Sequence, residues 1–159
     1  MWMHVEIRST GLKKRSLRHP LLRARLIRML QAMNTPENAE VSVLLCTDLF
    51  IQKLNHEYRS LDKPTDVLAF ALQLDATMPS GVSTAPQSGL PCILGDIIIS
   101  VDTAARQAKS NGIALVAETT MLLAHGLLHL LGYDHAEPDE AKTMFSKQAE
   151  LIHIATAKQ

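Results

Sequence analysis

The sequence contains no apolar run that reaches the roughly 18 to 20 residues needed for a membrane-spanning helix. Its first ten residues, MWMHVEIRST, lack the apolar core of a secretory signal. Only two cysteines are present, Cys46 and Cys92, which are too few for a disulfide scaffold and are not spaced as a metal-binding pair. These absences predict a cytoplasmic protein with no membrane partner and with both thiols reduced.

The formal net charge is zero, but the charges are unevenly distributed along the chain. Residues 1–30 contain eight lysines and arginines against one acid, Glu6, whereas the other 129 residues contain eight basic and fifteen acidic residues. A basic segment can hold RNA by neutralising its phosphates. It can equally be the solvated face of a helix. Both interpretations stay open for Arg18, Arg23, Arg25 and Arg28, which are expected on the polar side of one helix.

The pattern of apolar residues divides the chain into short strands and longer helices. The alternation of Met3, Val5 and Ile7 with polar residues indicates a half-buried strand. Strands are expected at residues 3–8, 40–46, 66–72 and 93–100, and helices at about 17–34, 47–58, 102–111, 114–131 and 139–154. The predicted N-caps are Ser16, then Thr47 or Asp48, then Ser100 or Asp102, and the predicted helix ends lie at Gly112 and Gly132.

A length of 159 residues with 47% hydrophobic and 20% charged residues is typical of one domain, here residues 1–159. Strands and helices alternate in the first two thirds, and only helices follow. This order predicts the α+β class, with a small mixed β-sheet covered by helices. Residues 73–91, which are rich in proline and glycine, are expected to form a long loop.

Three of the seven histidines, His125, His129 and His135, lie within eleven residues. His125 and His129 are four positions apart on a predicted helix, so both rings project from one face. Gly132 ends this helix, which allows the following turn to bring His135 to the same metal ion. Three imidazoles leave the fourth tetrahedral position open, as catalytic zinc sites do. The alternative is a leucine-rich core helix with two hydrogen-bonded histidines.

Neighbouring residues limit the chemistry of this predicted site. A zinc peptidase has a glutamate after the first helical histidine, and Gly126 stands there, which disfavours a peptidase. Glu118 lies about 10 Å from His125 along the helix axis, too far to act on the same water molecule. This distance favours a structural role or a role outside the metal ligands. Asp134 has two open interpretations, orientation of an imidazole or capping of the turn.

The segment HGLLHLLGYDH at 125–135 resembles the signature of the YbeY-type endoribonucleases, which are bacterial rRNA maturation factors. The segments LNHEYR at 54–59, PTDVLAF at 64–70 and LGDIIIS at 94–100 stand in the order of that family's other blocks. The resemblance implies one metal ion, usually zinc, on His125, His129 and His135, and Arg59 in the active cleft. It also implies cleavage of single-stranded RNA in 16S rRNA maturation and ribosome quality control, with rRNA and the small ribosomal subunit as partners.

Arg59 suits this implied role because a planar guanidinium can bind a phosphate through two parallel hydrogen bonds. Arg59 and the three histidines are therefore the candidate catalytic residues of a metal-dependent endoribonuclease. Two other functions stay open. The same site can belong to a zinc hydrolase of another substrate class. Alternatively, the chain is a non-catalytic ribosome-associated factor whose basic helix carries the function.

Overall fold

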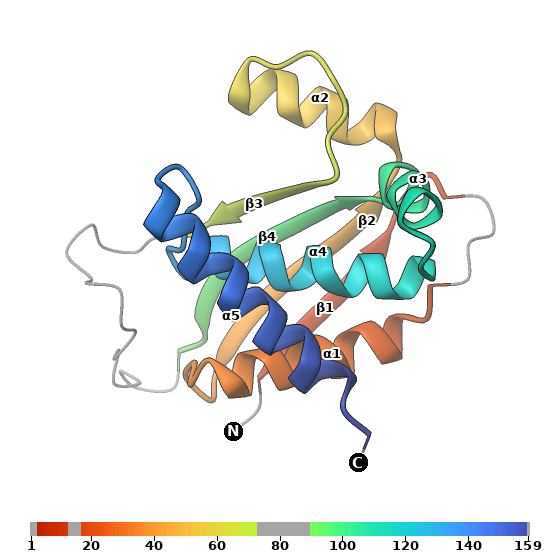
Figure 1. The fold of residues 1–159 in the computed structure, drawn as a ribbon. Helices are drawn as coiled ribbons and strands as arrows, with labels where there is room; N and C mark the ends of the chain where they lie inside the picture. Colours follow the sequence, from red (N-terminus) through yellow and green to blue (C-terminus); the bar gives the residue numbers. More distant parts are fainter. Residues whose placement is uncertain (1–2, 13–16, 73–89, 159) are drawn as a thin grey trace.

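The computed structural model describes residues 3–12, 17–72 and 90–158. Within these ranges the chain forms four strands and five helices, which confirms the predicted α+β class (Figure 1). The strands are β1 (His4–Ser9), β2 (Ala39–Cys46), β3 (Val67–Ala71) and β4 (Cys92–Ser100). The helices are α1 (His19–Ala32), α2 (Asp48–Arg59), α3 (Val101–Asn111), α4 (Leu115–Leu130) and α5 (Pro138–Thr156).

The four strands form one mixed sheet in the order β1-β2-β4-β3. Strands β1, β2 and β4 run parallel, and β3 pairs with β4 in the antiparallel direction. The mixed sheet predicted from the sequence is therefore confirmed. Strand β3 lies at one edge of the sheet. The connection from α2 enters it on the side of α3, and the strand then runs toward the end of α4 (Figure 1).

The two faces of the sheet are covered unequally. One face carries alternating buried residues such as Val5, Ile7 and Ile97, and it packs against α1, α4 and α5 in the main core. On the other face, α2 covers part of β3 and β4 through Ile51 and Leu68. The rest of that face is a groove of about 310 Å³ lined by polar and apolar side chains, among them Glu6, Arg8, Ser42, Leu44 and Asp96.

Helix α4 is the central element of the core. Its leucines, including Leu122, Leu123, Leu127 and Leu128, are at most 1% exposed, so the helix is surrounded by protein on almost every side. None of the described helices is by itself long and apolar enough to cross a membrane. Helices α3 and α4 together have the length and apolar composition of such a span, but the chain bends by 116° between them.

The helix ends follow the predicted capping residues with one exception. The Thr47 hydroxyl accepts a hydrogen bond from the Phe50 N–H at the start of α2, and Ser100 caps α3 in the same way. Helix α1, however, begins at His19 with Arg18 in the N-cap position, so the prediction of a Ser16 cap was wrong. A proline near the first helical position explains this start. Its fixed φ suits a helix, and it has no backbone N–H that would need a hydrogen-bond partner there. Ser16 and residues 73–89 of the expected loop lie outside the described residues.

Three arginines of α1 make hydrogen bonds inside the protein. Arg23 donates to the Val5 carbonyl of β1 at 3.0 Å, and Arg25 donates to the buried Thr120 hydroxyl of α4 at 2.7 Å. Arg28 donates to two carbonyl groups at the end of α5, each at 3.1 Å. These side chains attach α1 to three neighbouring elements. Arg23, Arg25 and Arg28 are half-buried, so these three side chains do not form a fully solvated helix face.

Candidate metal centre and its cavity

The end of α4 and the turn after it bring the three predicted histidines together. The Nε2 atoms of His125 and His129 lie 3.1 Å apart. Helix α4 ends at Leu130, and Gly132 adopts φ +93°, a conformation that favours glycine, so the chain turns back toward the helix. Each of the three histidines offers a ring nitrogen, and these atoms all lie within 4.8 Å of one another. The predicted meeting of His125, His129 and His135 is confirmed.

This arrangement could hold a metal ion. Zinc binds imidazole nitrogen at about 2.0 to 2.1 Å, so two ligands of one ion lie at most about 4.2 Å apart. The Nε2 atoms of His125 and His129, 3.1 Å apart, are within this limit, and the three ring nitrogens as a set lie within 4.8 Å of one another. Burial lowers the pKa of His129, and repulsion from His125 and His135 lowers it further, against the opposing effect of Asp134. His129 is therefore held in the neutral form, which is the form that ligates metals.

Gln148 of α5 fixes the orientation of one candidate ligand. Its Oε1 accepts a hydrogen bond from Nδ1 of His125 at 2.8 Å. With the hydrogen on Nδ1, the Nε2 atom keeps its lone pair and faces His129. The sequence analysis missed Gln148, because it lies 23 positions from His125 on another helix. Its placement one turn from the buried residues Met144 and Leu151 could have indicated that it faces inward, but not which group it contacts.

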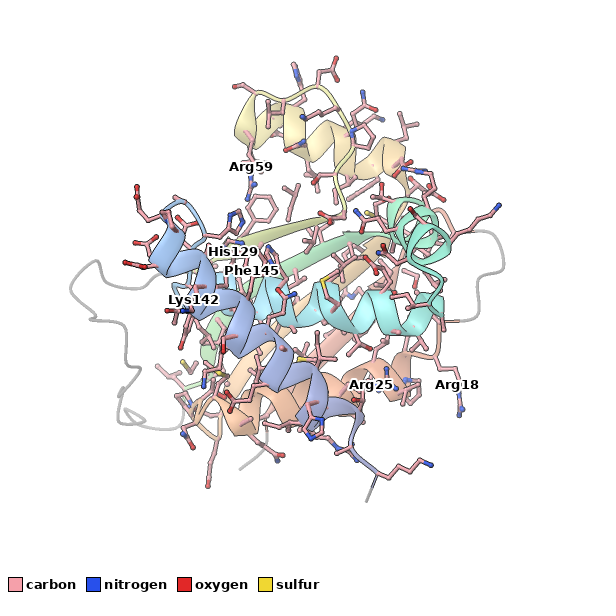
Figure 2. The ribbon with its side chains drawn as sticks, viewed as in Figure 1. Arg18, Arg25, Arg59, His129, Lys142 and Phe145 are labelled. Carbon is pink, nitrogen blue, oxygen red and sulfur yellow. The ribbon has the colours of Figure 1, made fainter. Side chains whose placement is uncertain are left out.

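Arg59 faces the three histidines across a cavity of about 170 Å³. Figure 2 shows its side chain extending from the end of α2 toward the region of His129. No hydrogen bond or ion pair joins the Arg59 guanidinium to another residue in the described part of the chain. The cavity is lined by Arg59, Thr65, Asp66, Val67, Ala69, His125, Gly126, His129 and His135. The structure thus brings together all four candidate catalytic residues predicted from the sequence.

The helix that carries Arg59 is anchored at its other end. Asp48, in the first turn of α2, accepts hydrogen bonds from the hydroxyls of Ser100 and Thr103, each at 2.6 Å, and forms an ion pair with Arg106 at 2.8 Å. Burial alone raises the pKa of Asp48, but these hydrogen bonds outweigh it and the net pKa is lowered. The backbone N–H of Asp48 in turn donates to the carboxylate of Asp102 at 2.9 Å. These bonds fix the start of α2 to α3.

The segment between α2 and β3 is held by side chains as well. The buried Asn55 amide donates to the Lys63 carbonyl at 2.9 Å. Asp66, which lines the cavity, accepts from the Val67 N–H at 2.8 Å and from the Gln107 amide at 3.2 Å. This part of the cavity wall is therefore set by hydrogen bonds rather than by apolar packing. A polar wall suits a charged ligand better than an apolar one.

Three residues considered beside the histidines have structural roles. Asp134 accepts a hydrogen bond from the His135 backbone N–H at 2.7 Å, which agrees with the capping interpretation. Glu118 is buried in the first turn of α4, where burial raises its pKa and a hydrogen bond with Asn111 opposes the rise. A Cβ at Gly126 would lie 2.8 Å from Cγ2 of Ile97, so the close packing of α4 on β4 excludes the glutamate of a zinc peptidase at this position.

Comparisons with known proteins agree with the geometry. The family model described as "Endoribonuclease YbeY" matches residues 7–155. A protein named Endoribonuclease YbeY from Anaeromyxobacter dehalogenans is 48% identical over 130 residues, which cover 82% of this chain and 61% of that protein. Its counterpart from Bacillus licheniformis is 48% identical over 117 residues, which cover 74% of this chain and 72% of the relative.

The fold is also similar to a solved structure. The solution structure of a protein from Thermotoga maritima matches with a TM-score of 0.62 and 28% identity, over 95% of this chain and 88% of that one. The match extends over almost the whole of both chains, so the sheet and its covering helices are shared. Together with the family match and the identities to named relatives, the residues that build the cavity lead to one conclusion: this chain belongs to the YbeY family of endoribonucleases.

Proposed function

We propose that this chain is a metal-dependent endoribonuclease that cuts single-stranded RNA at the cavity between α2 and α4. One observation carries the proposal: the same cavity is lined by three imidazoles able to hold a metal ion and by Arg59, whose guanidinium has no hydrogen bond or ion pair among the described residues. Family membership supports an activity on RNA. The site combines groups for a metal and for a phosphate, a combination that suits metal-assisted phosphodiester hydrolysis.

The metal assigned to the site is zinc, one ion per chain, held by His125, His129 and His135. Three neutral imidazoles suit a borderline-soft ion and do not suit magnesium, which prefers oxygen ligands. Zinc in such a site supplies Lewis acidity and lowers the pKa of a water molecule to about 7. Gln148 keeps His125 in the tautomer that ligates, and burial keeps His129 neutral.

Arg59 is assigned to the scissile phosphate. Its guanidinium can donate two parallel hydrogen bonds to phosphate oxygens and offset the negative charge that develops on them. The bonds that hold Asp48 and Asn55 fix α2 and the segment after it, so the arginine is presented by a supported helix end. A group held in place before the reaction stabilises the transition state without a cost of reorganisation.

The proposed cellular role is 16S rRNA maturation and ribosome quality control in the cytoplasm, on the small ribosomal subunit. Support for this role comes from the family, since the four blocks that resemble it include Arg59 and all three histidines. The basic segment at residues 1–30 adds little support, because Arg23, Arg25 and Arg28 are used inside the fold.

The test compares the proposed function with the two alternatives in one set of samples. Protein stripped with a chelator and then reloaded with zinc is given a labelled single-stranded RNA and the same RNA in a duplex. The proposal expects cleavage of the single strand only after reloading, and none by His129→Ala. A zinc-loaded protein that leaves RNA intact while hydrolysing another ester would favour the other hydrolase class. Binding to small ribosomal subunits without any cleavage would favour the non-catalytic factor.

A further inference from the structure

Aromatic side chains are scarce in this protein, yet most of them lie near the cavity. The chain has one tryptophan, two tyrosines and three phenylalanines. Tyr58 precedes Arg59, Phe70 follows the cavity residue Ala69, and Tyr133 lies in the turn between His129 and His135. The remaining member of this group, Phe145, comes from α5. Tyr58 and Phe70 are thus sequence neighbours of cavity residues, and Phe145 faces two of the three histidines.

Phe145 is the member of this group that faces the metal ligands with an exposed ring. Its centroid lies 6.2 Å from that of His135 and 6.4 Å from that of His125, at interplanar angles of 17° and 27°. Its neighbour Met144 is fully buried, whereas Phe145 is 51% exposed. A phenyl ring without a polar group is thus left open to solvent at the edge of the site.

We infer that Phe145 is a stacking platform for one unpaired base of the RNA, in a nucleotide adjoining the phosphate that is cut. The inference rests on the proposed function and deepens it. Aromatic side chains bind single-stranded nucleic acids by stacking, and they do so with little sequence preference because every base has a π face. The short distance from Phe145 to His135 places the stacked base next to the metal centre rather than at a remote surface.

This platform gives a physical reason for a preference for single strands. A base in a duplex is already stacked between its neighbours and paired, so its faces are not available to Phe145. An unpaired base gains the contact and covers the exposed phenyl ring. Tyr58, the other strongly exposed aromatic residue near the cavity, carries a hydroxyl that water can solvate, and its ring already contacts Phe70 edge-on at 5.2 Å. Phe145 differs from Tyr58 in lying beside the rings of His125 and His135, so a base stacked on it would adjoin the candidate metal centre.

The experiment uses zinc-saturated protein and single-stranded RNA that carries the fluorescent base 2-aminopurine. Stacking quenches this base, so rapid mixing reports binding before cleavage occurs. Replacing Phe145 with alanine is expected to abolish the quenching and to weaken binding by about 5- to 150-fold, the range for one stacked base. Phe145→Trp is expected to keep both. The matched control is Phe50→Ala, which removes a phenylalanine that is 37% exposed on α2 and does not line the cavity.

The outcomes separate this inference from the proposed function. Unchanged quenching and affinity in Phe145→Ala would overturn the inference, whether or not the parent protein cuts RNA. An equal loss in Phe50→Ala would also overturn it, because the effect would then not belong to the site. A parent protein that quenches 2-aminopurine through Phe145 but never cleaves the RNA would support the stacking platform and contradict the proposed function.

Discussion

The arginines of α1 and the single arginine at the end of α2 show how differently the same side chain is used in one molecule. Arg23, Arg25 and Arg28 each donate to a carbonyl or hydroxyl of another element. Arg59 has no hydrogen bond or ion pair within the described residues and faces the three histidines. Charge density along the sequence left two interpretations of the first group open, an RNA-binding surface or a solvated helix face. The group that each guanidinium contacts indicates the role of an arginine better than charge density along the sequence does.

The hydrogen bonds around Arg25 and around the helix of Arg59 differ in the same way. Arg25 lies against the buried Thr120 and helps to hold α1 on α4. Arg59 instead stands on a helix that other residues hold, through Asp48 at its start and Asn55 near its end. Removing Arg23, Arg25 or Arg28 therefore takes away a contact between elements of the fold, whereas removing Arg59 takes away a group that faces the cavity.

Arg59→Ala is expected to have the largest effect in this comparison. The rate of RNA cleavage should fall by about 10² to 10³, the cost of removing one donor that stabilises transition-state charge. Zinc content and melting temperature should equal those of the parent, since Arg59 makes no hydrogen bond or ion pair in the part of the chain that the structure describes. Arg59→Lys should recover only part of the rate, because a point charge cannot make two parallel bonds. The measurement is the single-turnover rate beside zinc content and melting temperature, and a rate that falls only in step with stability would contradict the assignment.

Gln148→Leu tests a residue that has a partner inside the protein and yet serves the site. Loss of its hydrogen bond frees the His125 ring, and zinc affinity is expected to fall by about 10- to 100-fold, as for other residues that orient metal ligands. Competition with a chelating dye measures the affinity. Gln148→Glu, which retains an acceptor, should bind zinc more tightly than Gln148→Leu. Equal affinity in all three proteins would show that Gln148 does not position His125.

Arg25→Ala is expected to act on stability and not on catalysis. The change removes a charged hydrogen bond and leaves the Thr120 hydroxyl oxygen without its donor, at a cost of about 1.5 to 3 kcal/mol in the free energy of unfolding. Cleavage by the folded fraction should equal that of the parent. Urea unfolding measures the first quantity and single-turnover cleavage the second. The exposed Arg18, which extends away from the protein in Figure 2, provides the control, because Arg18→Ala should change neither.

The smallest expected effect concerns salt. If α1 contributes no phosphate contacts, the slope of log affinity for single-stranded RNA against log salt concentration stays the same in Arg18→Gln. Each lost contact would instead reduce the slope by about 0.7. A flatter slope would restore Arg18 as an RNA contact and weaken the contrast between α1 and α2.

Local patterns in the sequence were sufficient for the elements and for the meeting of His125, His129 and His135. His125 and His129 are one helical turn apart and Gly132 follows closely, so the site forms from neighbours in the chain. The apolar alternation that indicated a strand at residues 3–8 corresponds to β1 at His4–Ser9. The contact of Arg25 with Thr120 spans 95 positions and that of Gln148 with His125 spans 23, and neither has a local signal. The antiparallel direction of β3 likewise depends on packing between distant segments.

The most direct test of the account is a titration of metal-free protein with zinc, in which bound zinc and the single-turnover rate of RNA cleavage are measured on the same samples. The account predicts a rate that rises in proportion to bound zinc and levels off at one ion per chain. His129→Ala should bind zinc poorly and stay inactive throughout. Full cleavage by the metal-free protein, or a chain saturated with zinc at these histidines that does not cut single-stranded RNA, would contradict the account.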